Sequence, residues 1–94
     1  MDVPEEFKYL KSCFWNGSHR EAENERAWVA RALNMSTPEE QKVIKKFLDE
    51  LLNGNASVEE LQKAWRSGSG SYGLHDDKIR AFFVLIRDLI EDQV

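Results

Sequence analysis

The sequence has one cysteine, two prolines and no long apolar run, and these shortages exclude several protein classes. A single cysteine, Cys13, cannot form an internal disulfide or a site with several thiolate ligands, which fits a reducing compartment. No apolar stretch approaches the roughly 18 residues of a membrane span. The opening residues, MDVPEEFKYL, lack the basic start and apolar stretch of a secretory signal. We therefore expect a soluble, cytoplasmic protein.

Basic residues are also in short supply, but only in the second half of the chain. Residues 1–47 carry eight acids and eight bases, whereas residues 48–94 carry nine acids and five bases. The second half therefore accounts for the whole net charge of −4. Nucleic-acid binding needs cations that displace counterions from phosphates. The charge pattern points away from direct nucleic-acid binding and toward a basic partner.

The alternation of apolar and polar residues that is typical of strands is absent, whereas helical spacing recurs along the chain. With 94 residues and a hydrophobic share of 41%, the chain is large enough for one packed domain, residues 1–94. We expect an all-α bundle of about five helices with a Ser/Gly loop before the last one. The predicted helices run from Pro4 to Phe14, over 19–34, from Pro38 to Asn53, over 58–66, and onward from the acidic pair at 76 and 77.

Two helix starts carry the signature of a capping box, in which two side chains satisfy free backbone donors. Thr37 is followed by Glu40 at the third helical position, and Ser57 is followed by Glu60 in the same way. Ser18 is a candidate cap for the helix over 19–34. Asn53-Gly54 predicts a left-handed stop for the third predicted helix.

The most distinctive stretch is 59–74, which begins as a helix and ends in a Ser/Gly tract. Trp65, four residues after Leu61, is expected to pack inward and support the surface above it. Tyr72 lies between glycines and is either an anchor to the core or an interface aromatic. The acids that follow, Asp76 and Asp77, complement the dipole of the last helix.

No catalytic, metal or cofactor site can be assembled from the remaining residues, so we do not expect an enzyme. Neither His19 nor His75 has metal-ligand spacing from Cys13 or from the other histidine, although a Cys–His pair could meet in space. The paired carboxylates each open a helix, where acids are electrostatically favoured. The Ser/Gly tract lacks the lysine and preceding strand of a phosphate-binding loop.

A DNA-binding regulator or antitoxin is the alternative, because the helices within 43–66 could form a helix-turn-helix. The second helix offers Gln62, Lys63 and Arg66 to base edges. The negative charges of Glu59 and Glu60 on the same helix offset the positive charges of Lys63 and Arg66.

Several segments of the second half match a known pattern. The run FLDELLNGN at 47–55 is followed by Glu60-Leu61-Gln62 and Trp65, then by Ser67-Gly68 and Tyr72. The closing helix contains RAF at 80–82 and IRD at 86–88. Over about residues 43–92 the chain resembles a family of contact-dependent growth inhibition immunity proteins.

That resemblance implies a small cytoplasmic protein that binds and neutralises the toxin domain of a partner effector. Such toxins are commonly nucleases, often RNases directed at tRNA, and an acidic inhibitor can occupy their basic cleft. The expected contacts are Tyr72, His75, Asp76, Asp77 and Glu59, with Trp65 as structural support beneath them.

Overall fold

A computed structural model of the chain describes residues 3–14, 23–68 and 73–93, excluding the side chain of residue 93. These residues form five helices and no strand, which confirms the all-α prediction. The helices are α1 (Glu5–Ser12), α2 (Glu25–Leu33), α3 (Pro38–Asn53), α4 (Val58–Arg66) and α5 (Asp76–Gln93). In the described part of the chain, no helix is both long enough and apolar enough to cross a membrane.

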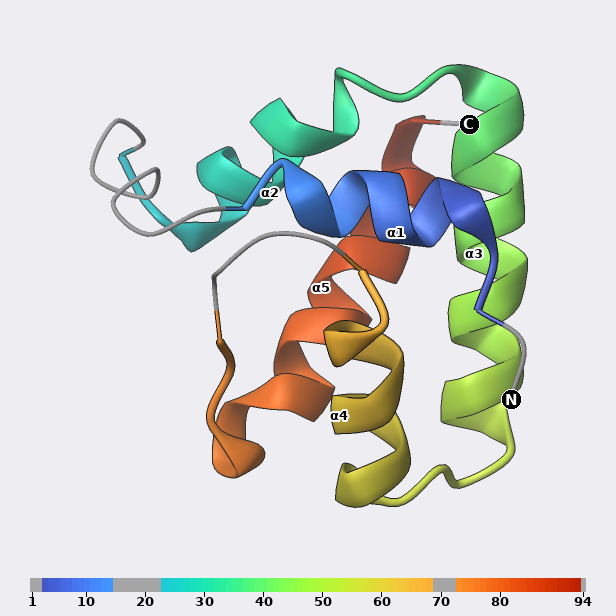
Figure 1. Ribbon diagram of the computed structural model, residues 1–94. Helices are drawn as coiled ribbons and strands as arrows, with labels where there is room; N and C mark the ends of the chain where they lie inside the picture. The colour runs from blue at the N-terminus through green and yellow to red at the C-terminus, as the bar shows by residue number, and fades with distance from the viewer. Residues whose placement is uncertain (1–2, 15–22, 69–72, 94) are drawn as a thin grey trace.

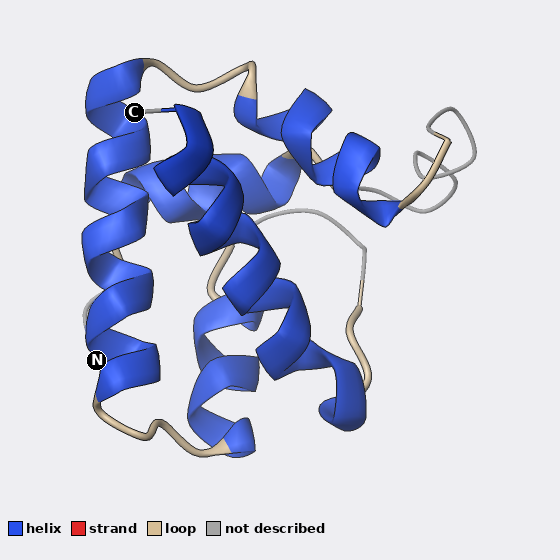
Figure 2. Cartoon of the chain, turned by 180° about the vertical axis from the view of Figure 1, so that it is seen from behind, coloured by secondary structure: helices blue, strands red, loops and turns tan. Residues whose placement is uncertain are grey.

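The last helix, α5, is the element on which most of the others pack (Figure 1). It contacts α2, α3 and α4, and α4 lies beside its first half. The short α1 crosses in front of α5 and packs on α3 (Figure 1). From behind, α3 and α4 run in nearly opposite directions, whereas α4 and α5 start at the same end of the molecule (Figure 2).

Both predicted capping boxes are present. At the start of α3, the Glu40 N–H donates to Thr37 Oγ1 at 3.2 Å, and the Thr37 N–H donates to Glu40 Oε1 at 2.8 Å. At the start of α4, the Glu60 N–H donates to Ser57 Oγ and the Ser57 N–H donates to Glu60 Oε1, both at 3.2 Å. These helix starts are therefore set locally, by the sequence around each cap.

The start of the second helix differs from the prediction. We expected a helix over 19–34 with Ser18 as its cap, but α2 begins at Glu25. Asn24 has extended backbone angles, and its side-chain Oδ1 accepts the Ala27 N–H at 2.8 Å. This cap satisfies a free donor and fixes the helix start at that point. Residues 15–22, Ser18 among them, lie outside the described part of the chain.

The predicted left-handed stop after α3 is also displaced by one residue. Gly54 has a φ of −83°, whereas Asn55 takes the left-handed conformation with a φ of 55°. Gly54 is needed for space, because a Cβ there would lie 2.8 Å from the Glu50 carbonyl oxygen. Asparagine tolerates the left-handed region better than most residues, so the pair still ends the helix.

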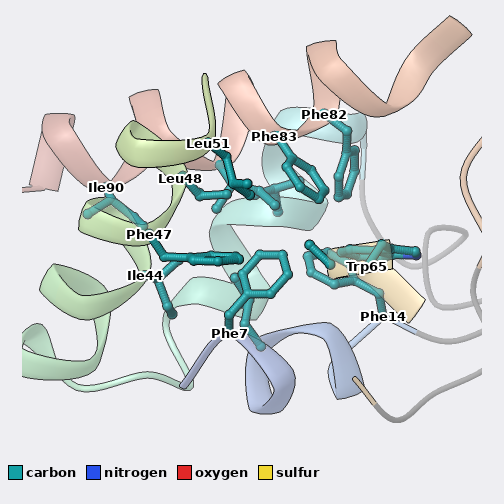
Figure 3. Close-up of a cluster of buried hydrophobic side chains, with 14 of the residues drawn as sticks. Phe7, Phe14, Ile44, Phe47, Leu48, Leu51, Trp65, Phe82, Phe83 and Ile90 are labelled. Carbon is teal, nitrogen blue, oxygen red and sulfur yellow. The ribbon is translucent and has the colours of Figure 1, made fainter. Parts of the chain in front are cut away.

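The core contains a cluster of aromatic rings, and Trp65 is part of it (Figure 3). The indole is only 1% exposed. Its centroid lies 5.8 Å from that of Phe14, 5.6 Å from that of Phe82 and 6.1 Å from that of Phe83. Phe7 lies on a fourth side at 6.2 Å and also meets the ring of Phe47 in α3 at 5.2 Å. Trp65 therefore joins α4 to α1 and α5 through ring contacts.

Truncation of Trp65 should be severe. Trp65→Ala is expected to lower the free energy of unfolding by about 3–5 kcal/mol, because it removes a buried ring and leaves a cavity. Urea unfolding followed by circular dichroism measures this loss. Trp65→Phe retains a ring and should cost clearly less. A loss below about 1 kcal/mol for the alanine variant would contradict the central position of Trp65.

Candidate interaction surface

The amino ends of α4 and α5 lie together at one end of the molecule (Figures 1 and 2). Gln62, which is 6% exposed, connects them through its side-chain amide. Its Nε2 donates to the Leu74 carbonyl at 2.7 Å and to Asp76 Oδ1 at 2.9 Å. The Arg80 guanidinium in α5 donates to the Ala56 carbonyl before α4. These bonds fix the two helix starts relative to each other.

The predicted contact residues divide into three groups. Glu59 on α4, and His75, Asp76 and Asp77 at the start of α5, are all exposed. Trp65 lies in the core beneath the surface of α4. The predicted contact Tyr72 lies outside the described residues.

The exposed acids at these two helix starts differ in what already engages them. The Glu60 carboxylate closes the capping box with Ser57, and the Asp76 carboxylate accepts the Gln62 amide. Among the described residues, the side chains of Glu59 and Asp77 have no hydrogen-bond or ion-pair partner. Each lies in the first turn of its helix, where the dipole favours a negative charge. Their ionised carboxylates can therefore accept hydrogen bonds from a cationic partner.

A hollow of about 370 Å³ adjoins this surface between α2 and α5. Ala81 and Phe82 contribute apolar groups, and three charged side chains, from Glu25, Asp77 and Lys78, line it as well. Glu25 was not among the predicted contacts. We expected Glu25 to lie inside a longer helix, whereas it is the first residue of α2. The complete lining is Glu25, Gly73, Leu74, His75, Asp77, Lys78, Ala81 and Phe82.

The Ser/Gly tract begins with a close contact to α1. A Cβ on Gly68 would lie 3.0 Å from the Lys11 Cβ and 3.2 Å from the Lys8 carbonyl oxygen. The Ser67 hydroxyl donates to the Ala64 carbonyl at 2.6 Å. These two residues of the tract thus contact α4 and α1, and glycine at the second of them leaves room for the close approach of α1.

Cys13 has the surroundings of a structural thiol. Its Sγ lies 3.6 Å from the Tyr9 carbonyl oxygen and 3.7 Å from Met35 Sδ. Burial raises the pKa of the thiol, and a hydrogen bond with Ser12 opposes this effect. The described residues contain no group of three or more His, Cys, Asp or Glu side chains that could hold a metal ion. The exposed side chains at the starts of α4 and α5 can form hydrogen bonds and ion pairs.

Two observations bear on the helix-turn-helix alternative. Gln62, one of the three proposed base-reading residues, is buried and bonded to Leu74 and Asp76. The helices α3 and α4 run in nearly opposite directions (Figure 2), whereas a DNA-binding pair crosses closer to a right angle. Neither observation favours DNA binding by α3 and α4. The DNA-binding alternative stays a prediction.

No protein-family model matches the chain, and neither a curated protein nor a solved structure matches it.

Removal of the Gln62 amide tests how the surface is held together. Gln62→Met keeps most of the side-chain volume but deletes the bonds to Leu74 and Asp76. We expect a loss of about 1–3 kcal/mol in unfolding free energy, with faster amide hydrogen exchange at Lys78 and Ile79 in the first turn of α5. Lys63→Met, at the neighbouring exposed position, is the control. Equal exchange in the two variants would show that the hydrogen bonds of the Gln62 amide do not order the start of α5.

The thiol of Cys13 should react slowly. Because its pKa is raised by burial, less of the reactive thiolate is present at neutral pH. Alkylation by iodoacetamide should therefore be slower in the folded protein than for free cysteine, and urea should restore the rate. Mass spectrometry follows the reaction. A rate faster than that of free cysteine would revive a nucleophilic role.

Proposed function

We propose that this protein is an immunity protein that binds the toxin domain of a contact-dependent growth inhibition effector. The toxin is a basic nuclease, most simply one that cleaves tRNA, and the inhibitor covers its active site. The proposal assigns contacts to Glu59, His75, Asp76 and Asp77, and to Tyr72. Trp65 supports them from the core. Such a nuclease acts in the cytoplasm, so the proposal also places the inhibitor there.

The observation that carries the proposal is the pairing of two acidic helix starts at one end of the molecule (Figure 1). The amide of Gln62 and the guanidinium of Arg80 fix them in position. Glu59 and Asp77 remain available for a partner's cations. Because the hydrogen bonds of Gln62 and Arg80 order this surface before binding, less conformational entropy is lost when the partner arrives.

The electrostatics suit an inhibitor of a nuclease. A domain that cleaves RNA needs positive charge around its active site to bind phosphates. The negative excess lies in residues 48–94, which include both helix starts. Complementary charge accelerates the encounter and disfavours partners of the same sign. The resemblance to immunity proteins over about 43–92 supplies the class of partner.

Co-purification tests the proposal directly. The tagged protein should retain the product of the neighbouring upstream gene. Co-expression should protect cells from that product. The proposal fails if the two proteins do not associate, or if they associate without protecting the cells.

Charge reversal then tests the surface. The double variant Glu59→Lys with Asp77→Lys should slow association with the toxin domain by roughly tenfold or more at low salt, because attraction becomes repulsion. Surface plasmon resonance at two salt concentrations measures this, and the difference should shrink as salt screens the charges.

Glu39→Lys is a matched control for Glu59→Lys. Each glutamate is exposed and is the second residue of a helix that starts with a capping box. Both substitutions therefore disturb a helix dipole in the same way. Glu39 lies at the start of α3, toward the other end of the molecule (Figure 1). If Glu39→Lys slows association as much as Glu59→Lys, the α4 start has no special role.

A further inference from the structure

Another hollow lies away from the acidic helix starts, along α3. It has a volume of about 690 Å³ and is formed by α3 together with the carboxyl-terminal part of α5. Ile90 lines it, and the other lining residues are polar or charged. They are Lys42, Lys45, Lys46, Asp49, Glu50, Asn53 and Glu91.

The charges in this hollow are sorted along α3. In α3 the three lysines precede the two acids, so the charge that this helix contributes to the hollow changes sign along its length. Lys45 is engaged, because its Nζ lies 2.7 Å from Asp49 Oδ2 and 3.4 Å from Glu91 Oε1. The hydrogen bond with Asp49 raises the pKa of Lys45.

The outer charges of the same helix lack such pairs. Among the described residues, Lys42, Lys46 and Glu50 have no ion-pair partner, and all three side chains are exposed. Lys42 and Lys46 are four residues apart, a spacing at which like charges repel. Glu50 lies in the last turn, where the helix dipole disfavours an acid and no basic residue is present. Lys46 and Glu50 have the same spacing, which suits an ion pair, yet the two side chains do not pair within one copy, so both charges are available to a second copy.

The shape around these residues suits a helix. Lys46 and Glu50 also line a second hollow of about 300 Å³ on the side of Val3 and Pro4. The two side chains therefore form a ridge with a hollow on either side. Helices associate when the ridge of one enters the groove of another. Val43, 37% exposed, lies beside the ridge as an apolar contact.

A uniformly charged partner does not fit this hollow. A polyanion would meet Asp49, Glu50 and Glu91, and a polycation would meet the lysines. The matching partner has acids opposite the lysines and lysines opposite the acids. An antiparallel copy of α3 has this order of charges.

We propose that the outer face of α3 is a self-association surface, on which α3 of a second copy packs antiparallel about a two-fold axis midway between Lys46 and Glu50. Lys46 of each copy then faces Glu50 of the other. The two pairs are separated along the helix by roughly 6 Å, the rise of four residues. Lys42 lies near the carboxyl end of the opposing α3, where free carbonyls favour a cation. A two-fold axis makes the interface isologous, so every favourable pair occurs twice.

Charge swapping tests this pairing. Lys46→Glu alone and Glu50→Lys alone should each weaken dimerisation by about tenfold or more, because like charges then face each other across the axis. The double variant Lys46→Glu with Glu50→Lys should restore the dimer. An equimolar mixture of the two single variants should form a heterodimer. Sedimentation equilibrium from about 1 μM to 1 mM measures these affinities.

Lys63→Glu is the control, since Lys63 is an exposed lysine on α4 that does not line the hollow. It should leave the dimer affinity unchanged, and circular dichroism should show that all variants fold. A wild-type protein that stays monomeric over the whole range overturns the proposal. So does a dimer that neither single variant weakens, and so does failure of both the double variant and the mixture to restore association.

Discussion

The ring of Trp65 in α4 contacts aromatic side chains of both α1 and α5, and the short helices depend on these contacts. Phe7 lies in α1 and Phe14 lies just after it. Phe82 and Phe83 lie in α5, and all four rings contact the ring of Trp65. α1 has eight residues, and α2 and α4 have nine each. Helices of this length are unstable alone in water. Their stability must come from the shared core, so loss of one ring weakens several helices together.

The same core determines which residues reach the surface. Because Leu61, Ala64 and Trp65 are buried, the rotation of α4 about its axis is fixed. Glu59 and Lys63 then face solvent, and Gln62 lies at the boundary with α5. A side-chain amide suits that position, since it satisfies both a backbone carbonyl and a carboxylate. The acidic surface is therefore a consequence of how the aromatic cluster packs, and the two cannot be altered independently.

Features that depend on neighbours in the sequence were predictable, and features that depend on the fold were not. The helical class, both capping boxes and the inward face of α4 follow from local spacing and local hydrogen bonds. The predicted start of α2 was wrong. Residues that favour helices lie on both sides of Asn24, but Asn24 itself has extended backbone angles and caps a helix that begins after it. Gln62 was assigned to base reading because its partners, Leu74 and Asp76, are far away in the sequence. Glu25 beside Asp77 and the pairing of Lys45 with Glu91 likewise require the tertiary arrangement.

The outer face of α3 and the first turn of α5 lie on opposite sides of the molecule in both views (Figures 1 and 2). Two copies joined through α3 would therefore leave the acidic start of α5 accessible in each. The helix α3 carries nearly as many lysines as acids. Packing two copies of α3 together therefore places little net negative charge in the interface. Steering of a basic partner depends on the summed field of all charges. Pairing would strengthen that field while leaving both binding surfaces open, and the two proposed interactions would support each other.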